Sequence, residues 1–186
     1  MKEKNKAIFL DRDGVINEEV SHLSDPDKFI FIKGSIEALK ILKDLGYLLI
    51  VITNQAGIAR GLFNEETLSK IHEKMKRILN ENNMIIDDIF YCPHHPEFTG
   101  SCNCRKPKPG MIFSAAEKYN INLNESYMVG DTLGDIETGF NAKCKTILVM
   151  TGYGKEEKRK IDKVKPDFIF NNLLEFAKNL KLNLVL

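Results

Sequence analysis

Short apolar runs alternate along this chain with longer segments whose apolar residues recur at helical spacing. An apolar run of roughly four to eight residues fits a buried strand and is too short for a helix. Strands that alternate with helices in this way predict a parallel sheet with helices on both faces, a Rossmann-like three-layer α/β/α fold. The predicted strands are Ala7–Leu10, Tyr47–Ile52, Asp87–Tyr91, Tyr127–Val129, Thr146–Met150 and Asp167–Phe170.

Helices are predicted between these strands. Their ranges are 35–45, 65–80, 110–119 and 132–141, with a closing helix from Leu173. Gly46 is placed to end the first helix, and Asn64 is a suitable N-cap for the second. His72 falls outside the apolar stripe of the second helix, so we expect it at the surface.

The whole chain has the balance of an ordinary globular protein. Its 186 residues fit a single domain, 1–186, and the charged and apolar fractions are 28% and 43%. A net charge of +1 gives no general attraction to nucleic acid or to an anionic membrane. No apolar run is long enough to cross a bilayer, and the charged N-terminus has no signal-peptide core. We therefore expect a cytoplasmic protein.

Two acids follow the first predicted strand. In an extended segment alternate side chains share a face, so Asp11 and Asp13 are expected to point one way and Arg12 the other. Two carboxylates on one face at a buried strand end raise the free energy unless a cation or a proton lies between them. An isolated pair of this kind also fits a solvated acidic turn.

Polar residues at three more strand ends favour phosphate chemistry over that turn. Thr53-Asn54 follows the second strand, Arg105-Lys106 ends the segment after the third, and Asp131 and Asp135 follow the fourth. In a parallel α/β sheet ligands bind beyond the carboxyl ends of the strands, where the strand order reverses. Phosphoryl transfer needs a nucleophile, a divalent metal and donors around the phosphoryl oxygens, and these residues supply such a set.

Three of the four cysteines lie in one short segment with two histidines. Cys92-Pro93-His94 and Cys102-Asn103-Cys104 offer four nitrogen and sulfur ligands, a set typical of a closed, structural zinc site. Free thiols or a disulfide are the alternatives, although a reducing compartment disfavours a disulfide. The adjacent His95 is an alternative ligand to His94.

These motifs resemble those of the haloacid dehalogenase superfamily of phosphatases. Asp11-Arg12-Asp13-Gly14 is similar to the first motif, Thr53 to the second, Lys106 to the third and Gly130–Asp135 to the fourth. Within the superfamily the chain looks most like a zinc-binding subgroup that contains heptose bisphosphate and histidinol-phosphate phosphatases. The spacing leaves no room for a large cap domain, and a monomer is the simplest expectation.

The resemblance implies a role for each motif residue. Asp11 is expected to attack phosphorus and form an aspartyl-phosphate, while Asp13 protonates the leaving oxygen and later deprotonates water. Mg²⁺ is expected at the carboxylates of Asp11 and Asp131 and at the backbone carbonyl of Asp13. Thr53 and Lys106 are expected to hold the phosphoryl oxygens.

The resemblance also assigns Cys92, His94, Cys102 and Cys104 as the zinc ligands. Asp135 fits two roles, a residue near the metal or an acid that favours the helix dipole.

The substrate expected from the resemblance is a small sugar phosphate. The segments 53–61 and 104–111 are similar to those of the heptose enzymes, which implies removal of the C7 phosphate of a heptose 1,7-bisphosphate. Residues 19–22 depart from the heptose pattern, and Thr132 stands where the resemblance implies, in both subgroups, a basic residue that helps to hold the substrate. Lys108 or Arg60 is the alternative source of that positive charge. Expected substrate contacts are Glu19, His22, Asn54, Arg105 and Thr132.

Three other functions remain open. Histidinol phosphate or another small ester is an alternative substrate within the subgroup. A phosphoacceptor signalling domain and an inactive zinc scaffold belong to different functional classes.

Overall fold

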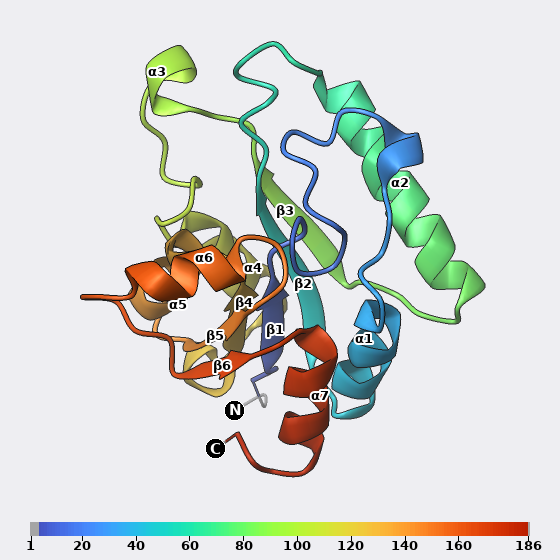
Figure 1. The fold of residues 1–186 in the computed structure, drawn as a ribbon, viewed down its shortest axis with the longest axis vertical. Coiled ribbons are helices and arrows are strands. Elements are labelled where there is room, and N and C mark those ends of the chain that lie inside the picture. Colours follow the sequence, from blue (N-terminus) through green and yellow to red (C-terminus); the bar gives the residue numbers. More distant parts are fainter. Residues whose placement is uncertain (1–3, 186) are drawn as a thin grey trace.

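A computed structural model describes residues 4–185 of the chain. Six strands form one parallel sheet in the order β3-β2-β1-β4-β5-β6 (Figure 1). The strands are β1 (Ala7–Leu10), β2 (Leu48–Asn54), β3 (Asp88–Cys92), β4 (Tyr127–Gly130), β5 (Lys145–Val149) and β6 (Phe168–Phe170).

Six helices lie in the connections between the strands, and α7 follows the last strand within the described residues. The helices are α1 (Ser35–Asp44), α2 (Glu65–Glu81), α3 (Pro96–Thr99), α4 (Gly110–Tyr119), α5 (Leu133–Asn141), α6 (Gly154–Glu157) and α7 (Leu173–Lys181). Short 3₁₀ turns cover Pro26–Lys28, Leu123–Glu125 and Lys158–Lys160. Strand β1 and helix α4 have the predicted bounds, whereas the short helix α3 was not expected from the sequence.

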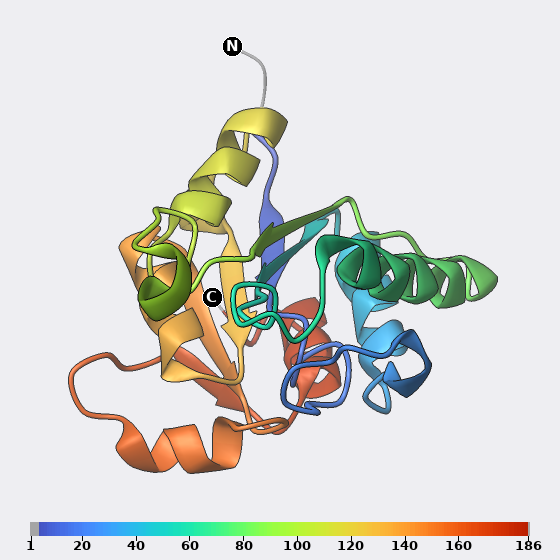
Figure 2. The same ribbon diagram turned by 90° about the horizontal axis from the view of Figure 1, so that it is seen from above.

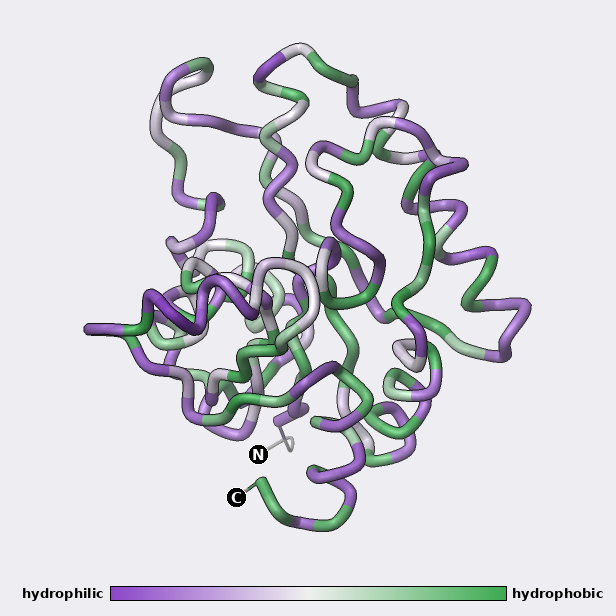
Figure 3. Tube along the Cα trace, in the orientation of Figure 1, coloured by the Kyte–Doolittle hydropathy of each residue, from purple (hydrophilic) through white to green (hydrophobic). Residues whose placement is uncertain are grey.

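The sheet separates two apolar clusters, as the alternating side chains of β1 show. Ile8 and Leu10 belong to a cluster with residues of α1, α2 and α7, whereas Ala7 and Phe9 pack on the opposite face with α4. Figures 1 and 2 show helices on both faces of the sheet. In Figure 3 the central strands are largely hydrophobic, while the lysine-rich segment around α6 is hydrophilic. The predicted three-layer α/β/α fold is therefore confirmed.

The strand order reverses between β1 and β4, and the first site motif lies at this point. Phe9 of β1 is in register with Ile50 of β2 on one side and Met128 of β4 on the other. The backbone N–H of Asp11 then donates to the carbonyl of Val129 at 2.9 Å. This bond ties the residue after β1 to the end of β4, at the place where parallel α/β sheets bind ligands.

Strand β2 ends two residues later than the sequence suggested, at Asn54. Thr53 and Asn54 remain in the sheet because β3 continues beside them, with Tyr91 and Cys92 as their partners. Both residues are consequently held by backbone pairing. Within residues 4–185, no helix is long and apolar enough to cross a membrane.

The prediction that His72 lies at the surface is wrong. Its side chain is buried between α2 and the sheet, with 8% of its surface exposed. Position 72 lies four residues after the buried Leu68 and therefore on nearly the same side of the helix. A buried polar partner, Arg12, makes this position favourable for an imidazole.

We predict that Gly139→Ala destabilises the protein, because α5 packs closely on the sheet at this residue. A Cβ at Gly139 would lie 2.7 Å from the Cβ of Met128 and 2.8 Å from the Cγ2 of Thr146. The expected loss in the free energy of unfolding, measured by chemical denaturation, is about 1–3 kcal/mol.

Gly134 on the same helix provides the matched control, because a Cβ there meets its nearest atom at 3.6 Å. Gly134→Ala should be neutral or stabilise by up to about 1 kcal/mol. Equal losses for the two variants would contradict the close packing at Gly139.

Candidate active site

A polar cavity of about 180 Å³ opens at the carboxyl ends of the central strands. It is lined by residues at or after the ends of β1, β2 and β4 and by Lys106 from the loop before α4. The lining residues are Asp11, Asp13, Glu19, Thr53, Asn54, Lys106, Thr132, Gly134 and Asp135.

Lys106 is the buried cation of this cavity, with 5% of its side chain exposed. Its Nζ lies 2.8 Å from Oδ1 of Asp11 and 2.6 Å from Oδ1 of Asp135. Burial disfavours the charged ammonium, but the two carboxylates outweigh this effect and raise the pKa of Lys106. Asn54 fixes the backbone of Lys106 from both sides, since its amide donates to the Lys106 carbonyl and accepts from the Lys106 N–H.

Each of the two carboxylate oxygens of Asp135 has its own partner. One carboxylate oxygen pairs with Lys106, and the other accepts hydrogen bonds from the backbone N–H and the hydroxyl of Thr132. Thr132 in turn accepts from the Asp135 N–H, which completes a capping box at the start of α5. Asp135 therefore stabilises the helix N-terminus and also lies within the acidic cluster.

Three carboxylates come close together in this cluster. Asp11, Asp131 and Asp135 each place an oxygen within 4.8 Å of the others. Burial, together with the neighbouring acids, raises the pKa of Asp11 to about 7 and that of Asp131 to about 8, although Lys106 opposes both shifts. The single positive charge of Lys106 does not balance three carboxylates, and their oxygens are the hard donors that a divalent cation such as Mg²⁺ prefers.

Asp131 is held from the backbone side. Its Oδ2 accepts from the N–H of Tyr153 at 2.8 Å. Gly14 and Gly152 both have positive φ, and a Cβ on either would collide with the Asp131 carboxylate. The two glycines therefore allow the backbone to approach Asp131 closely.

Asp13 is held by the side chains of three neighbours. The Arg12 guanidinium makes a forked contact with both carboxylate oxygens, at 2.8–3.2 Å. Asn17 donates to Oδ1 at 2.9 Å, and Gln55 donates to Oδ2 at 3.1 Å and also to the hydroxyl of Thr53. Burial raises the pKa of Asp13, but Arg12 and these hydrogen bonds outweigh it and leave the pKa below the usual value.

The sequence analysis missed Arg12, Asn17 and Gln55 as site residues. Arg12 was expected to point away from Asp13, but the chain turns after β1 and the guanidinium folds back onto that carboxylate. Gln55 lies within the segment 53–61 and Asn17 lies three residues after the first motif; both are buried polar side chains, which usually have hydrogen-bond partners.

The remaining expected substrate contacts lie at different places. Glu19 lines the cavity, where burial and the charge of Asp13 raise its pKa. His22 is exposed and is not among the lining residues. Arg105 also lies outside the lining, and its Nη1 donates to the carbonyl of His94 at 3.1 Å. The structure thus brings Glu19, Asn54 and Thr132 to the cavity but not His22 or Arg105.

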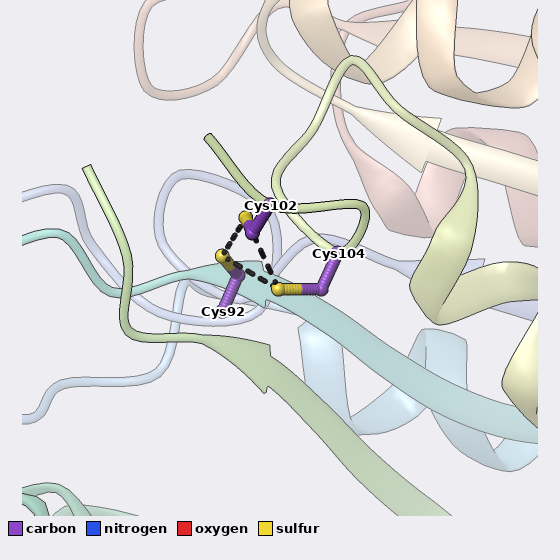
Figure 4. Close-up of side chains that lie close together, drawn as sticks. All are labelled: Cys92, Cys102 and Cys104. Atoms are coloured by element: carbon purple, nitrogen blue, oxygen red, sulfur yellow. Dashed lines mark hydrogen bonds between the residues drawn. The ribbon is translucent and has the colours of Figure 1, made fainter. Parts of the chain in front are cut away.

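A cysteine cluster lies just before Lys106 in the chain. The sulfur atoms of Cys92, Cys102 and Cys104 are 3.1–3.5 Å apart and point toward one another (Figure 4). Burial raises the pKa of Cys92, so this side chain stays a protonated thiol unless a nearby cation stabilises the thiolate. No disulfide joins the three, and the cluster is compatible with a structural metal.

Neither histidine of this loop joins the three sulfurs. The group whose ligand atoms all lie within 4.8 Å of one another contains the cysteines but not His94. His95 caps α3 instead, and its Nε2 lies 3.2 Å from Nη2 of Arg60.

Comparison with known proteins agrees with this geometry. A HAD-hydrolase-like family model matches residues 103–176. A D-glycero-β-D-manno-heptose-1,7-bisphosphate 7-phosphatase from Pasteurella multocida is 50% identical over 79% of this chain and 83% of its own. The protein of that name from Yersinia pestis is 39% identical over 97% and 98% of the two chains.

Solved structures give the same result. The heptose 1,7-bisphosphate phosphatase of B. bronchiseptica, complexed with magnesium and phosphate, superposes with a TM-score of 0.88 at 36% identity and covers 96% of this chain and 99% of its own. The corresponding enzyme from Burkholderia thailandensis gives a TM-score of 0.73 at 30% identity over 95% and 98%. The chain therefore belongs to the haloacid dehalogenase-like hydrolases and is a phosphatase of that family.

We predict that Mg²⁺ stabilises the protein more at about pH 8 than at about pH 5. The pKa values of Asp11 and Asp131 are raised in the native state. Between about pH 4 and about pH 8 the native state therefore binds more protons than the unfolded chain does. Without a cation these two groups therefore lower stability as the pH rises through this interval. A cation offsets that loss, while protons compete with it at the lower pH.

The measurement is the rise in unfolding temperature on adding magnesium chloride at each pH. Asp131→Asn is the control, and it should reduce the rise at both pH values. An equal rise at both pH values in the unsubstituted protein would contradict the assignment of the cation to these carboxylates.

Proposed function

We propose that this protein is a Mg²⁺-dependent phosphatase that removes the C7 phosphate of D-glycero-D-manno-heptose 1,7-bisphosphate through an aspartyl-phosphate. The observation that carries the proposal is the pairing of two carboxylates with different environments in one cavity. Asp11 is paired with the buried Lys106, and Asp13 is held by the fork of Arg12. The identity of the sugar is inferred from the substrate that the names of the relatives give.

In the first step a carboxylate oxygen of Asp11 attacks phosphorus and the bond from phosphorus to the sugar oxygen breaks. Asp13 gives a proton to the departing oxygen. The pKa of Asp13 is low in the free protein, so it must first take up a proton, and the negative charge of a bound phosphoryl group favours that uptake. The products are the dephosphorylated sugar and phosphorylated Asp11.

In the second step Asp13 acts as a base. It takes a proton from a water molecule, which attacks phosphorus and releases inorganic phosphate from Asp11. The fork of Arg12 and the amides of Asn17 and Gln55 stabilise the Asp13 carboxylate in the form that this step needs.

The other cavity residues neutralise and orient the phosphoryl group. Lys106 and Thr53 donate to its oxygens, and loss of one such donor commonly lowers the rate about 10²- to 10³-fold. Asp11, Asp131 and the Asp13 carbonyl would hold Mg²⁺, which would offset the repulsion between the nucleophile and the substrate. Asp135 keeps Lys106 in place and lies beside the metal ligands.

We further propose zinc at Cys92, Cys102 and Cys104, with His94 as the fourth ligand after a rotation of its side chain. Three sulfurs that already converge support this site. The zinc would fix the loop that ends in Arg105 and Lys106, one and two residues after Cys104. The proposal includes a cytoplasmic location, which suits four free thiols, and a monomeric single-domain chain.

Phosphorus NMR tests the function most completely. The purified protein with Mg²⁺ is offered heptose 1,7-bisphosphate and histidinol phosphate in parallel. We expect loss of the C7 signal of the heptose with its C1 signal retained. Faster cleavage of histidinol phosphate would overturn the substrate, and stable phosphoprotein without free phosphate would favour a signalling domain.

We predict that Asp13→Asn lowers kcat by about 10²- to 10⁴-fold, because asparagine cannot move the proton. Both steps slow, but phosphorylated Asp11 that does form should persist because its hydrolysis lacks a base, and intact-protein and peptide mass spectrometry would detect it. Asp11→Asn is the control and should show no phosphorylation. Turnover near that of the unsubstituted protein would exclude Asp13 as the proton carrier.

We predict that Cys104→Ser removes bound zinc, lowers the unfolding temperature and lowers activity. The physical reason is that loss of one thiolate opens a closed tetrahedral site and frees the loop before Lys106. Cys144→Ala is the matched control, since Cys144 is buried apart from the cluster, and it should keep its zinc. Full activity in a zinc-free protein by metal analysis would contradict the site.

A further inference from the structure

A buried contact joins helix α2 to the acid of the first motif. Arg12 is fully buried, and its Nε and Nη2 are directed at the carboxylate of Asp13. Its Nη1 lies 3.1 Å from Nε2 of His72. Within residues 4–185, His72 is thus the side chain that satisfies the end of the guanidinium facing away from Asp13.

The chemistry of this contact fixes the tautomer of the histidine. A guanidinium has donors and no acceptor, so Nε2 must accept and the ring proton lies on Nδ1. Burial and the charge of Arg12 lower the pKa of His72 to about 3, so the ring stays neutral. A neutral acceptor at this place lets the guanidinium be buried without a second negative charge.

We propose that His72 is a positioning residue, which locks the guanidinium of Arg12 so that its fork aims the Asp13 carboxylate at the oxygen that gains or loses a proton. The proposal rests on the proposed function in its kinetic part. His72 lies behind Arg12 and outside the cavity lining, so it touches neither phosphate nor sugar. Its effect is therefore expected in kcat and not in KM.

The geometry explains why a second anchor is needed. The fork on the Asp13 carboxylate leaves the guanidinium free to pivot about the Asp13 oxygens, because its three contacts, from Nε and Nη2, all lie along one edge of the guanidinium plane. The fourth contact, from Nη1 to His72, lies outside that edge and removes the pivot. Since a displacement of about 1 Å in a catalytic group commonly lowers a rate about 10²-fold, a small pivot is sufficient to affect turnover.

Two variants of His72 separate this role from simple packing. In His72→Gln the amide oxygen reaches about the place of Nε2 and accepts from Arg12, whereas in His72→Asn it stops near Nδ1. Both residues are neutral and polar, so a purely structural role predicts similar results for them. Glu73→Gln is the control, because Glu73 is exposed on the same helix and its side chain has no described contact with Arg12.

The kinetic experiment measures kcat and KM for phosphate release from the heptose bisphosphate. We expect His72→Asn to lower kcat about 10- to 100-fold with KM within about twofold, and His72→Gln to retain kcat within about threefold. Equal kcat values for the two variants, or a loss that appears in KM, would overturn the proposal.

Nitrogen-15 NMR provides a readout that needs no substrate. The unsubstituted protein should show His72 protonated at Nδ1 and an Arg12 Nη1–H, the group that faces His72, that exchanges slowly with water. Slow exchange should persist in His72→Gln and be lost in His72→Asn. Slow exchange in both variants would overturn the anchoring of Arg12, whether or not an ester is hydrolysed. If the unsubstituted protein releases phosphate from no ester while these signals hold, the proposed function fails and the anchoring stands.

Discussion

The ammonium of Lys106, buried between the carboxylates of Asp11 and Asp135, is the interaction on which the site depends. Three acids converge at the ends of β1 and β4, and this arrangement is costly in a medium of low polarity. Lys106 offsets part of that charge, while burial and then the neighbouring acids keep the pKa values of Asp11 and Asp131 raised. The remaining negative charge is what makes the cavity suitable for a divalent cation.

The fold supplies the positions that this pairing needs. Strands β1 and β4 are neighbours, so Asp11 and Asp131 meet although they are far apart in the sequence. Asn54, held in β2, fixes the backbone of Lys106 through two hydrogen bonds. The cysteine cluster lies directly before that lysine, so a metal there would act on the same loop.

Much of this arrangement follows from the sequence, because parallel strands bring their carboxyl ends to one edge of a sheet. The four-residue run of β1 and the strand ends at Thr53 and Asp131 identify that edge without further information. Side-chain directions beyond the strand ends do not follow from periodicity. Arg12 turns back onto Asp13 because the chain bends after β1, and its guanidinium there meets His72 of α2, 60 residues further along the chain. Contacts between residues so distant in the chain have no local signature.

The account's central claim is that the phosphoryl group passes through Asp11, which requires two successive displacements at phosphorus. The most direct test follows a thiophosphate ester made chiral at phosphorus with heavy oxygen isotopes and hydrolysed in isotope-labelled water. Each in-line displacement inverts phosphorus, so the account predicts overall retention of configuration. Overall inversion would show a single direct attack by water and would contradict the role of Asp11 as nucleophile.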